Sequence, residues 1–330
     1  MKRLIGALIL IAMFGSGLLL NNALTRPNGG KGSVIVEIAP GASARYVSRK
    51  LFKAGVINSP ALFEIEARLK GIKNVIRAGE FRLPRNISIR EVALRLARGA
   101  AVLHRVTIPE GLTTYETGEA LEKADIVSSD EFKAALLIYP KKQRRKIPSK
   151  SLEGYLFPET YHFRKGVSAR EVIKTMVSEF YRQAPSVLPG SVISDPDQLH
   201  RIITLASIIE KETGVDAERK LISSVFTNRL EKGMLLQSDP TVIYALPYFD
   251  GNLHKKDMKY DSPYNTYIHK GLPPGPIANP GLASIDAARR PLKGNYLYFV
   301  SKNNGGHHFS KTLKEHNRAV MIYQIKRGRR

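Results

Sequence analysis

Cysteine is absent from this chain of 330 residues. Its absence excludes a disulfide framework, a thiol nucleophile and a cysteine-ligated zinc ion, and it suits either side of a cell membrane. Acidic residues are also scarce, with 29 against 52 lysines and arginines, which gives a formal net charge of +23. Such an excess favours polyanionic partners such as nucleic acid, anionic lipid headgroups or an anionic wall polymer. With 43% hydrophobic and 25% charged residues, the chain is globular, and its length allows two or three domains.

Charge is missing from residues 4–25, directly after Lys2 and Arg3, and residues 4–20 are almost continuously apolar. Seventeen helical residues cover about 25 Å, which is short but workable for a tilted single span. We therefore predict that residues 1–25 form a cytoplasmic tip and an uncleaved transmembrane helix. A cleaved signal peptide is the alternative, which the bulky polar Asn22 disfavours at a position that needs a small residue.

This orientation predicts a single-pass protein of the plasma (inner) membrane whose N-terminus is cytoplasmic and whose body is periplasmic or extracellular. Nucleic acid is then excluded as a partner, and the sequence also lacks a Cys/His finger and a clustered aromatic-basic motif. The basic charge instead indicates affinity for wall polymers or the lipid surface. The run at residues 141–146 (KKQRRK) predicts a solvated loop, with a patch that contacts wall or lipid as the alternative.

Turn and cap residues divide the rest of the chain. Residues 26–32 (RPNGGKG) form a flexible linker. A weak repeat at an offset of 70 residues follows, in which Ser43 corresponds to Thr113. Each copy predicts a strand, a Pro/Gly turn and two short helices. We therefore expect an α+β fold, with a small module over residues 33–104 and a larger α+β domain over residues 105–330.

A long helix is predicted for residues 195–213. Asp195 supplies an N-cap oxygen, Pro196 suits the first helical position, and Gln198 completes a capping box. The apolar residues of its second half (IITLASIIEKET, residues 202–213) fall on one broad face at about 100° per residue. The sequence therefore predicts a helix with one buried side.

Two glutamates at the end of this helix are candidates for acid–base chemistry. Glu210 falls inside the apolar face, between Ala206 and Ile203, whereas Glu212 lies about 160° away. A carboxyl group held against apolar side chains is poorly solvated, and this favours the protonated acid that can donate to a leaving oxygen. The alternative is a salt-bridged residue at the helix boundary. The helix alone does not decide between the two glutamates.

Three later segments mix aromatic rings with carboxyl, amide and hydroxyl groups outside any regular period. They are residues 152–161 (LEGYLFPETY), 237–241 (QSDPT) and 262–267 (SPYNTY). Sugar-binding clefts have this composition, because flat rings contact the pyranose and polar groups bind its substituents. The alternative is that the rings fill a core and the polar residues cap turns.

Six ordered segments together resemble the signatures of a known family. They are LEGYLFPETY, LASIIEKET, QSDPTVIY, SPYNTY, GLPPGPIANPG and GGHHF. In order and spacing they are similar to the YceG-like family of endolytic murein transglycosylases, the MltG type. The resemblance covers residues 150–320 strongly and implies that residues 105–330 are the catalytic domain. More weakly, residues 33–104 resemble the LysM-like region of the family.

Position by position, the resemblance assigns the catalytic acid/base to Glu210, in the segment LASIIEKET. It implies substrate binding or support of Glu210 by a further set of residues in the cleft: Glu153, Gln237, Asp239, Tyr264, Asn265 and His307. His308 departs from the commoner pattern, so the sequence leaves open which histidine faces the cleft.

The resemblance implies cleavage of the bond between N-acetylmuramic acid and N-acetylglucosamine, without water, to give 1,6-anhydro ends that terminate nascent strands. One carboxyl suffices in this scheme, because the nucleophile is the C6 hydroxyl of the sugar, and neither a metal nor a cofactor is implied. The implied partners are peptidoglycan glycan strands, the membrane, and peptidoglycan synthases and penicillin-binding proteins. Two alternatives are a hydrolytic muramidase that adds Asp239 or Glu153 to Glu210, and a non-catalytic wall-binding scaffold.

Overall fold

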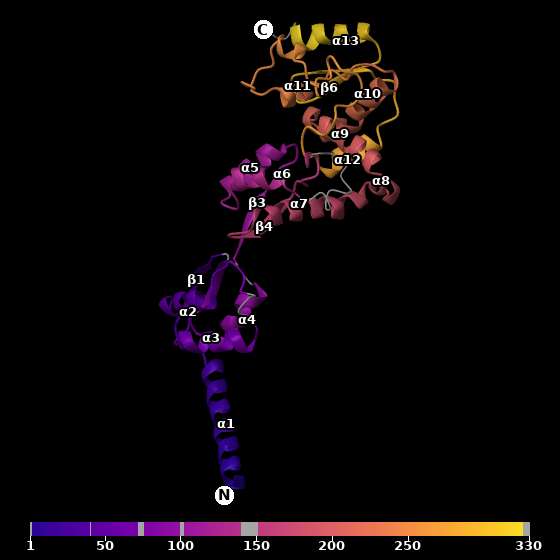
Figure 1. Ribbon diagram of the computed structural model, residues 1–330. Helices are drawn as coiled ribbons and strands as arrows, with labels where there is room; N and C mark the ends of the chain where they lie inside the picture. The colour runs from indigo at the N-terminus through magenta and orange to yellow at the C-terminus, as the bar shows by residue number, and fades with distance from the viewer. Residues whose placement is uncertain (1, 40, 72–75, 100–101, 140–150, 326–330) are drawn as a thin grey trace. The chain divides into compact units, whose positions relative to one another are not determined.

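The computed structural model describes residues 2–39, 41–71, 76–99, 102–139 and 151–325 (Figure 1). The basic run at residues 141–146 lies outside these ranges. The backbone divides into two compact units. The first unit comprises Met1–Arg105, Ala124–Val127 and His162–Ser168, and the second comprises Val106–Lys123, Ser128–Tyr161 and Ala169–Arg330.

The predicted N-terminal helix is present as α1 (Lys2–Thr25). Its C-terminal end belongs to the core of the first unit, where Leu24 is buried and Leu20 packs against the buried side chains. Further toward the N-terminus its large apolar side chains are exposed: Ile5, Leu8, Leu10, Ile11, Met13, Phe14, Leu18 and Leu19. Among the described residues, no helix combines the length and apolar character needed to cross a membrane.

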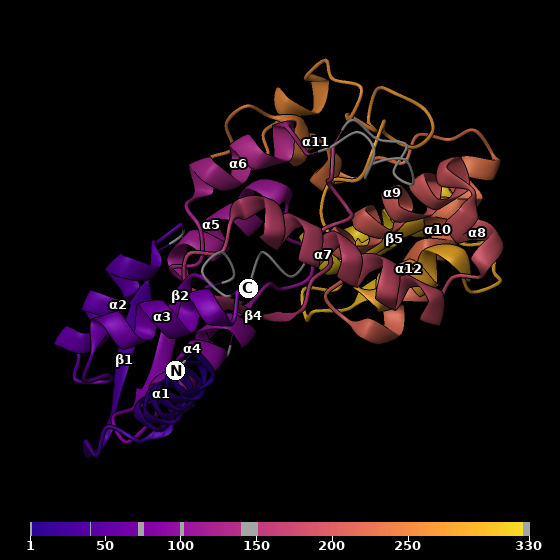
Figure 2. The same ribbon diagram turned by 60° about the horizontal axis from the view of Figure 1, so that its bottom comes forward.

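The rest of the first unit is an α+β module (Figure 2). Strands β1 (Ser33–Ile38) and β2 (Gly79–Pro84) pair antiparallel, with Val36 opposite Phe81. The buried side chains alternate along both strands, as the period of two along a half-buried strand requires. The helices are α2 (Ala44–Lys53), α3 (Pro60–Leu69) and α4 (Ile89–Arg98). One core of aliphatic and phenylalanine side chains joins these elements.

The helix boundaries of this module follow the predicted caps. Ser43, Ser59 and Ser88 each accept a hydrogen bond from the backbone N–H three residues further on. Gly99 ends α4 with φ +76°, a left-handed conformation that glycine adopts without a side-chain clash.

The second unit is mainly helical. Its helices are α5 (Thr114–Lys123), α6 (Ser129–Leu137), α7 (Ala169–Gln183), α8 (Gly190–Ser194), α9 (Pro196–Glu212), α10 (Arg219–Glu231), α11 (Asp239–Ala245), α12 (Leu282–Arg289) and α13 (Leu313–Val320). Strands β5 (Tyr298–Ser301) and β6 (His307–Ser310) form an antiparallel hairpin. A third two-stranded sheet pairs β3 (Leu103–Thr107) with β4 (Thr160–Arg164), and residues 103–105 and 162–164 of these strands belong to the first unit. The α+β fold class is therefore confirmed.

Helix α9 is the central element of the second unit, and α8, α10, α11 and α12 all contact it (Figure 1). It begins at the predicted cap, where Asp195 accepts hydrogen bonds from the N–H groups of Asp197 and Gln198. Every residue from Ile203 to Ile209 is buried. The prediction of a helix with a single buried side is therefore wrong, because neighbouring helices surround α9.

Candidate active site

A hollow of about 410 Å³ lies at the C-terminal end of α9. It is lined by residues from α9, α10, the start of α11, both strands of the β5–β6 hairpin and α13. Its polar side chains include a carboxyl pair, an amide, a phenol, a guanidinium and a histidine: Glu212, Asp239, Gln237, Tyr267, Arg229 and His307. Three of the residues predicted for substrate binding thus meet here, around Glu212 instead of Glu210.

Glu212 is the last residue of α9. Its Oε1 accepts a hydrogen bond of 2.6 Å from the hydroxyl of Ser238. Burial raises the pKa of Glu212 to about 7, and the charge of Asp239 adds to the shift, while the Ser238 hydrogen bond and Arg229 oppose it. Protonated and ionised forms of this carboxyl therefore coexist near neutral pH, as a group that donates and then recovers a proton requires.

Arg229 holds one wall of the hollow in place. Its Nε donates to the Leu297 carbonyl at 2.7 Å, and Nη1 donates to the Leu236 carbonyl at 2.8 Å and to Gln237 Oε1 at 3.3 Å. Gln237 has φ +51°, in the left-handed region that few residues other than glycine adopt. Strained backbone of this kind is common where a side chain must face a ligand.

Asp239 opens α11, and its Oδ1 accepts a hydrogen bond of 2.5 Å from the Tyr267 hydroxyl. Burial, followed by this bond, raises the pKa of Tyr267, which therefore stays a protonated donor. Asp239 and Glu212 thus line the same hollow.

The two adjacent histidines differ in their surroundings. His307 lines the hollow, and both its backbone N–H, at 2.9 Å, and its ring Nδ1, at 2.7 Å, lie against the Glu218 carboxylate. His308 is exposed, and its ring contacts Tyr323. The structure therefore places His307 on the hollow, with a ring that Glu218 orients through Nδ1.

Glu210 lies in a different environment. Its Oε1 is 3.2 Å from Arg219 Nη2, and its Oε2 accepts a hydrogen bond of 2.9 Å from the backbone N–H of Gly281. The side chains of Glu210 and Arg219 are only 7% and 9% exposed. The expectation of apolar surroundings for Glu210 is therefore wrong. Packing on all sides of α9 gives each glutamate its own neighbours, which a helical projection does not reveal.

Further acidic residues surround the same guanidinium. Arg219 Nη1 donates to Asp216 at 2.6 Å. Burial, followed by the charge of Glu210, raises the pKa of Glu110, whereas Arg219 lowers it. This ion-pair cluster joins the end of α9 to the start of α10 and to Gly281, directly before α12.

Glu153 and Tyr264 lie in another polar cluster, outside the lining of the hollow. The Glu153 carboxylate accepts hydrogen bonds from the Thr114 N–H at 2.9 Å, the Thr114 hydroxyl at 3.0 Å and the Tyr244 hydroxyl at 3.2 Å. Burial raises its pKa to about 7 against these hydrogen bonds. The ring of Tyr264 lies 5.0 Å from that of Tyr244. The structure thus links Glu153 to α5 and α11.

Asn265 is fully buried. Its Nδ2 donates to the carbonyls of Met258 at 3.0 Å and Tyr260 at 2.8 Å, and its Oδ1 accepts from the Tyr267 N–H at 2.9 Å. These hydrogen bonds stabilise the loop that contains Asn265 and occupy its side-chain amide. The structure therefore does not bring Asn265 to the hollow as a substrate ligand.

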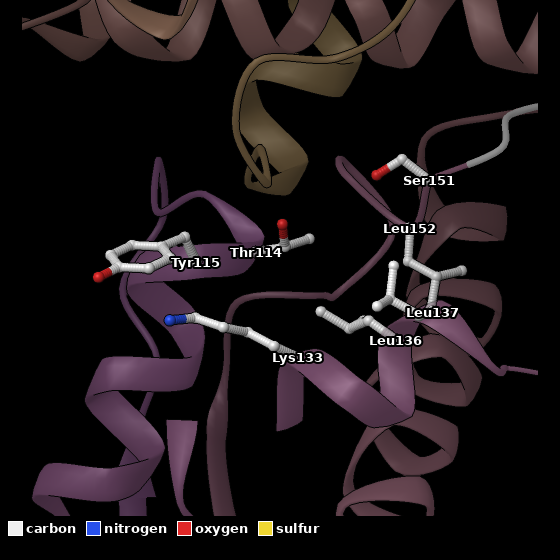
Figure 3. A pocket seen from close by; sticks show the side chains of 7 residues that line it. All are labelled: Thr114, Tyr115, Lys133, Leu136, Leu137, Ser151 and Leu152. Carbon is white, nitrogen blue, oxygen red and sulfur yellow. The ribbon is translucent and has the colours of Figure 1, made fainter. Parts of the chain in front are cut away.

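A second hollow, of about 390 Å³, lies between α5, α6 and the start of the 151–157 segment (Figure 3). In Figure 3, Tyr115 and Lys133 lie at one side of it and leucine side chains at the other. Lys133 Nζ lies 4.1 Å from the centre of the Tyr115 ring. None of the seven residues that line this hollow carries a carboxyl group.

The sequence profile of the YceG-like family matches residues 36–321. The chain belongs to the YceG-like family. An endolytic murein transglycosylase of Bacillus subtilis (strain 168) is 34% identical over 332 residues, covering 94% of this chain and 91% of the relative. The endolytic murein transglycosylase of Streptococcus pneumoniae (strain R6) is 28% identical, covering 93% of this chain and 61% of the relative. A crystal structure of a yceG-like protein from Listeria monocytogenes matches with a TM-score of 0.60 at 34% identity, covering 88% of this chain and all of that one.

Several residues around the hollow of this YceG-like chain were not predicted individually. Ser238 lies inside the segment QSDPT, where its hydroxyl binds Glu212, so its neighbours already pointed to it. Arg229 and Tyr267 gave no separate signal, because an arginine in a helix and a tyrosine in a loop are ordinary on a surface. Only the packing of α10 and β5 shows that Arg229 supports the hollow.

Proposed function

We propose that this protein is an endolytic lytic transglycosylase that cleaves the bond between N-acetylmuramic acid and N-acetylglucosamine in peptidoglycan glycan strands and leaves 1,6-anhydro ends. The observation that carries the proposal is Glu212, a carboxyl with a pKa of about 7 in a hollow lined by amide, phenol and imidazole groups. The relatives named as endolytic murein transglycosylases support it. Release of ends within nascent strands would terminate their growth.

In the proposed mechanism, Glu212 takes the role that the sequence assigned to Glu210. The Glu212 carboxylic acid protonates the glycosidic oxygen as the C1–O bond breaks. The C6 hydroxyl oxygen of the muramyl residue then bonds to C1, and its proton passes to the Glu212 carboxylate, which restores the acid. No water, metal or cofactor takes part. Holding both sugar oxygens near one carboxyl supplies the proximity contribution to the rate.

Hydrolysis is the second candidate, because Asp239 shares the hollow with Glu212. Most glycosidases use two carboxyl groups that flank the bond to be cut. The test is digestion of purified glycan strands by the detergent-solubilised full chain, followed by mass analysis of the new ends. Anhydro ends support the transglycosylase, reducing ends identify a muramidase, and intact strands identify a wall-binding scaffold.

The pH dependence of the rate tests the acid role of Glu212. Its folded-state pKa is raised from 4.5 to about 7, so the donating form predominates below neutrality and is lost as pH rises through 7. We expect kcat/KM for anhydro-end formation to fall about tenfold per pH unit above that point. Rates measured from pH 5 to 9 check this, and a rate that stays level to pH 9 contradicts it.

Several broader assignments are part of the same proposal. Residues 33–104 act as a LysM-like module and residues 105–330 as the catalytic domain, consistent with the strand–helix–helix–strand order of the first and the hollow in the second. Attachment to the plasma membrane occurs through α1, with the N-terminus cytoplasmic, and is supported by the exposed apolar side chains of this helix. Peptidoglycan synthases and penicillin-binding proteins are the proposed partners, because they make the strands to be cut.

The proposed localisation predicts the behaviour of reporter fusions. A phosphatase that is active only outside the cytoplasm, fused after Arg330, should be active in intact cells, and the fusion should sediment with membranes. The reason is the cationic pair Lys2 and Arg3 before the apolar segment, which keeps the N-terminus inside. The matched control replaces both cations with glutamate, which should lower reporter activity. An inactive phosphatase on a folded fusion contradicts the orientation.

A further inference from the structure

The outer face of α3 combines apolar and basic side chains. The exposed residues of this helix and its C-cap are Ala61, Ile65, Arg68, Leu69 and Lys70. Ala61, Ile65 and Leu69 follow one another at intervals of four, so they form one stripe. Ile65 and Leu69 are 41% and 64% exposed, although the core of the unit lies on the opposite side of the same helix.

The acidic residues of α3 point away from this stripe. Glu66 is buried and bonds to Arg90 Nε at 2.9 Å, and Glu64 accepts a hydrogen bond of 3.0 Å from Ser48. On the exposed face of α3, Arg68 and Lys70 flank the apolar stripe, and the partly exposed Glu64 lies 3.9 Å from Arg45, which pairs with it. An apolar stripe flanked by basic residues is the composition of a helix that lies in the interface of an anionic bilayer.

Helix α1, the proposed membrane anchor, contacts α3. It contacts mainly α3 and α4, and Arg90 Nη1 donates to Asn21 Oδ1 at 2.9 Å, so the end of α1 is fixed to the unit near residues 20–24. The exposed apolar side chains of α1 reach up to Leu19. In Figure 1, α3 lies at the end of the unit from which α1 extends. If α1 inserts into lipid, α3 arrives at the level of the headgroups.

The exposed apolar stretch of α1 is shorter than the hydrocarbon core of a bilayer. This stretch, Ile5 to Leu19, covers about 21 Å at 1.5 Å per residue, less than the roughly 30 Å of a hydrocarbon core. A short apolar helix draws its flanking residues against the bilayer, and this brings basic side chains to the phosphates. The first unit is thereby held on the surface by its own exposed face.

From these observations we propose that the face of α3 formed by Ile65, Arg68, Leu69 and Lys70 is a second membrane contact, which lies on anionic phospholipid headgroups and fixes the orientation of the first unit on the bilayer. The inference rests on the proposed attachment through α1 and is independent of the chemistry at Glu212. Its partner is the lipid surface itself, with phosphate as the group recognised by Arg68 and Lys70.

Because the chain contains no tryptophan, one introduced tryptophan reports its own surroundings. Leu69→Trp in the full chain, reconstituted into vesicles of phosphatidylcholine and phosphatidylglycerol, should emit at shorter wavelength than in detergent-free buffer and be quenched by brominated acyl chains. Phe52→Trp is the matched control: Phe52 is 50% exposed on α2, outside the main contacts of α1. Its emission should remain water-like. Equal, water-like emission from both variants overturns the proposal.

Vesicle flotation separates this proposal from the attachment on which it rests. A full chain that floats with vesicles while Leu69→Trp stays unquenched refutes the α3 contact and leaves α1 as an anchor. A chain that does not float refutes both. Replacing Arg68 and Lys70 with glutamine should reduce the quenching of Leu69→Trp on anionic vesicles, with a loss of affinity of roughly fivefold per basic residue. Unchanged quenching in that variant overturns the role of the two cations.

Discussion

Glu212→Gln is expected to lower the rate of anhydro-end formation by roughly 10²–10⁴-fold, the usual contribution of general acid–base catalysis. Glutamine keeps the size of the side chain and can still accept the Ser238 hydrogen bond of 2.6 Å, but it cannot donate and recover a proton. The fold should survive, because a buried acid is replaced by a neutral amide. Initial rates on purified glycan strands, measured with thermal melting of the same samples, check this result.

The matched control is Glu210→Gln, two residues earlier on the same helix. This substitution weakens the ion pair with Arg219 and changes the acceptor for the Gly281 N–H, so we expect a lower melting temperature. The rate of the folded fraction should fall much less than in Glu212→Gln, because Glu210 does not line the hollow. A folded Glu210→Gln that is inactive beside an active Glu212→Gln would return the catalytic role to Glu210.

The stability of Glu212→Gln should also depend on pH in a defined direction. The folded-state pKa of Glu212 is raised above its ordinary value, so the folded protein retains a proton that the unfolded chain releases between pH 4.5 and about 7. The contribution of Glu212 to the free energy of unfolding of the wild type therefore falls over that interval, by an amount on the order of 2–3 kcal/mol. The stability gain of the variant should be larger at pH 8 than at pH 4, and an equal gain at both values contradicts the burial of this carboxyl.

The parts of the fold that depend on local chemistry were predictable from the sequence. Asp195 and Pro196 set the start of α9 wherever that helix lies, and Ser43 and Ser88 do the same for α2 and α4. Such caps act within three residues, so no distant contact can alter them. The hairpin shows the limit, because β5 begins only at Tyr298, where pairing with the distant residues of β6 starts.

The candidate site depended on contacts between distant segments, and sequence reasoning was less successful there. A helical projection assigns Glu210 to the buried side of α9, where its side chain is indeed only 7% exposed, but it does not reveal that Arg219 pairs with Glu210 or that the loop at Ser238 also encloses Glu212. Asn265 has the composition of a sugar ligand, but its amide is used by neighbouring carbonyls. Gln237, Asp239 and His307, which the family motifs grouped together, do line one hollow.

Arg219→Met is expected to destabilise the second unit by about 3–5 kcal/mol, the usual result of removing one partner of a buried ion pair. Arg219 is 9% exposed and neutralises Glu210, Asp216 and the nearby Glu110. Methionine fills much of the volume but leaves the enclosed Glu210 carboxylate without its cationic partner, although the hydrogen bond from the Gly281 N–H remains. The melting temperature should fall by about 6–20 °C, at roughly 2–4 °C per kcal/mol for a unit of this size.

A double-mutant cycle distinguishes an ion pair from simple loss of packing. Arg219→Met combined with Glu210→Gln should be more stable than Arg219→Met alone, because no charge then remains enclosed at Glu210. Arg290→Met is the exposed control: Arg290 is 56% exposed in its pair with Asp286, so its loss should cost less than about 1 kcal/mol. Additive losses in the cycle would mean that Glu210 and Arg219 stabilise the junction independently. A positive coupling energy between the two substitutions would show that Glu210 and Arg219 stabilise the junction as an ion pair.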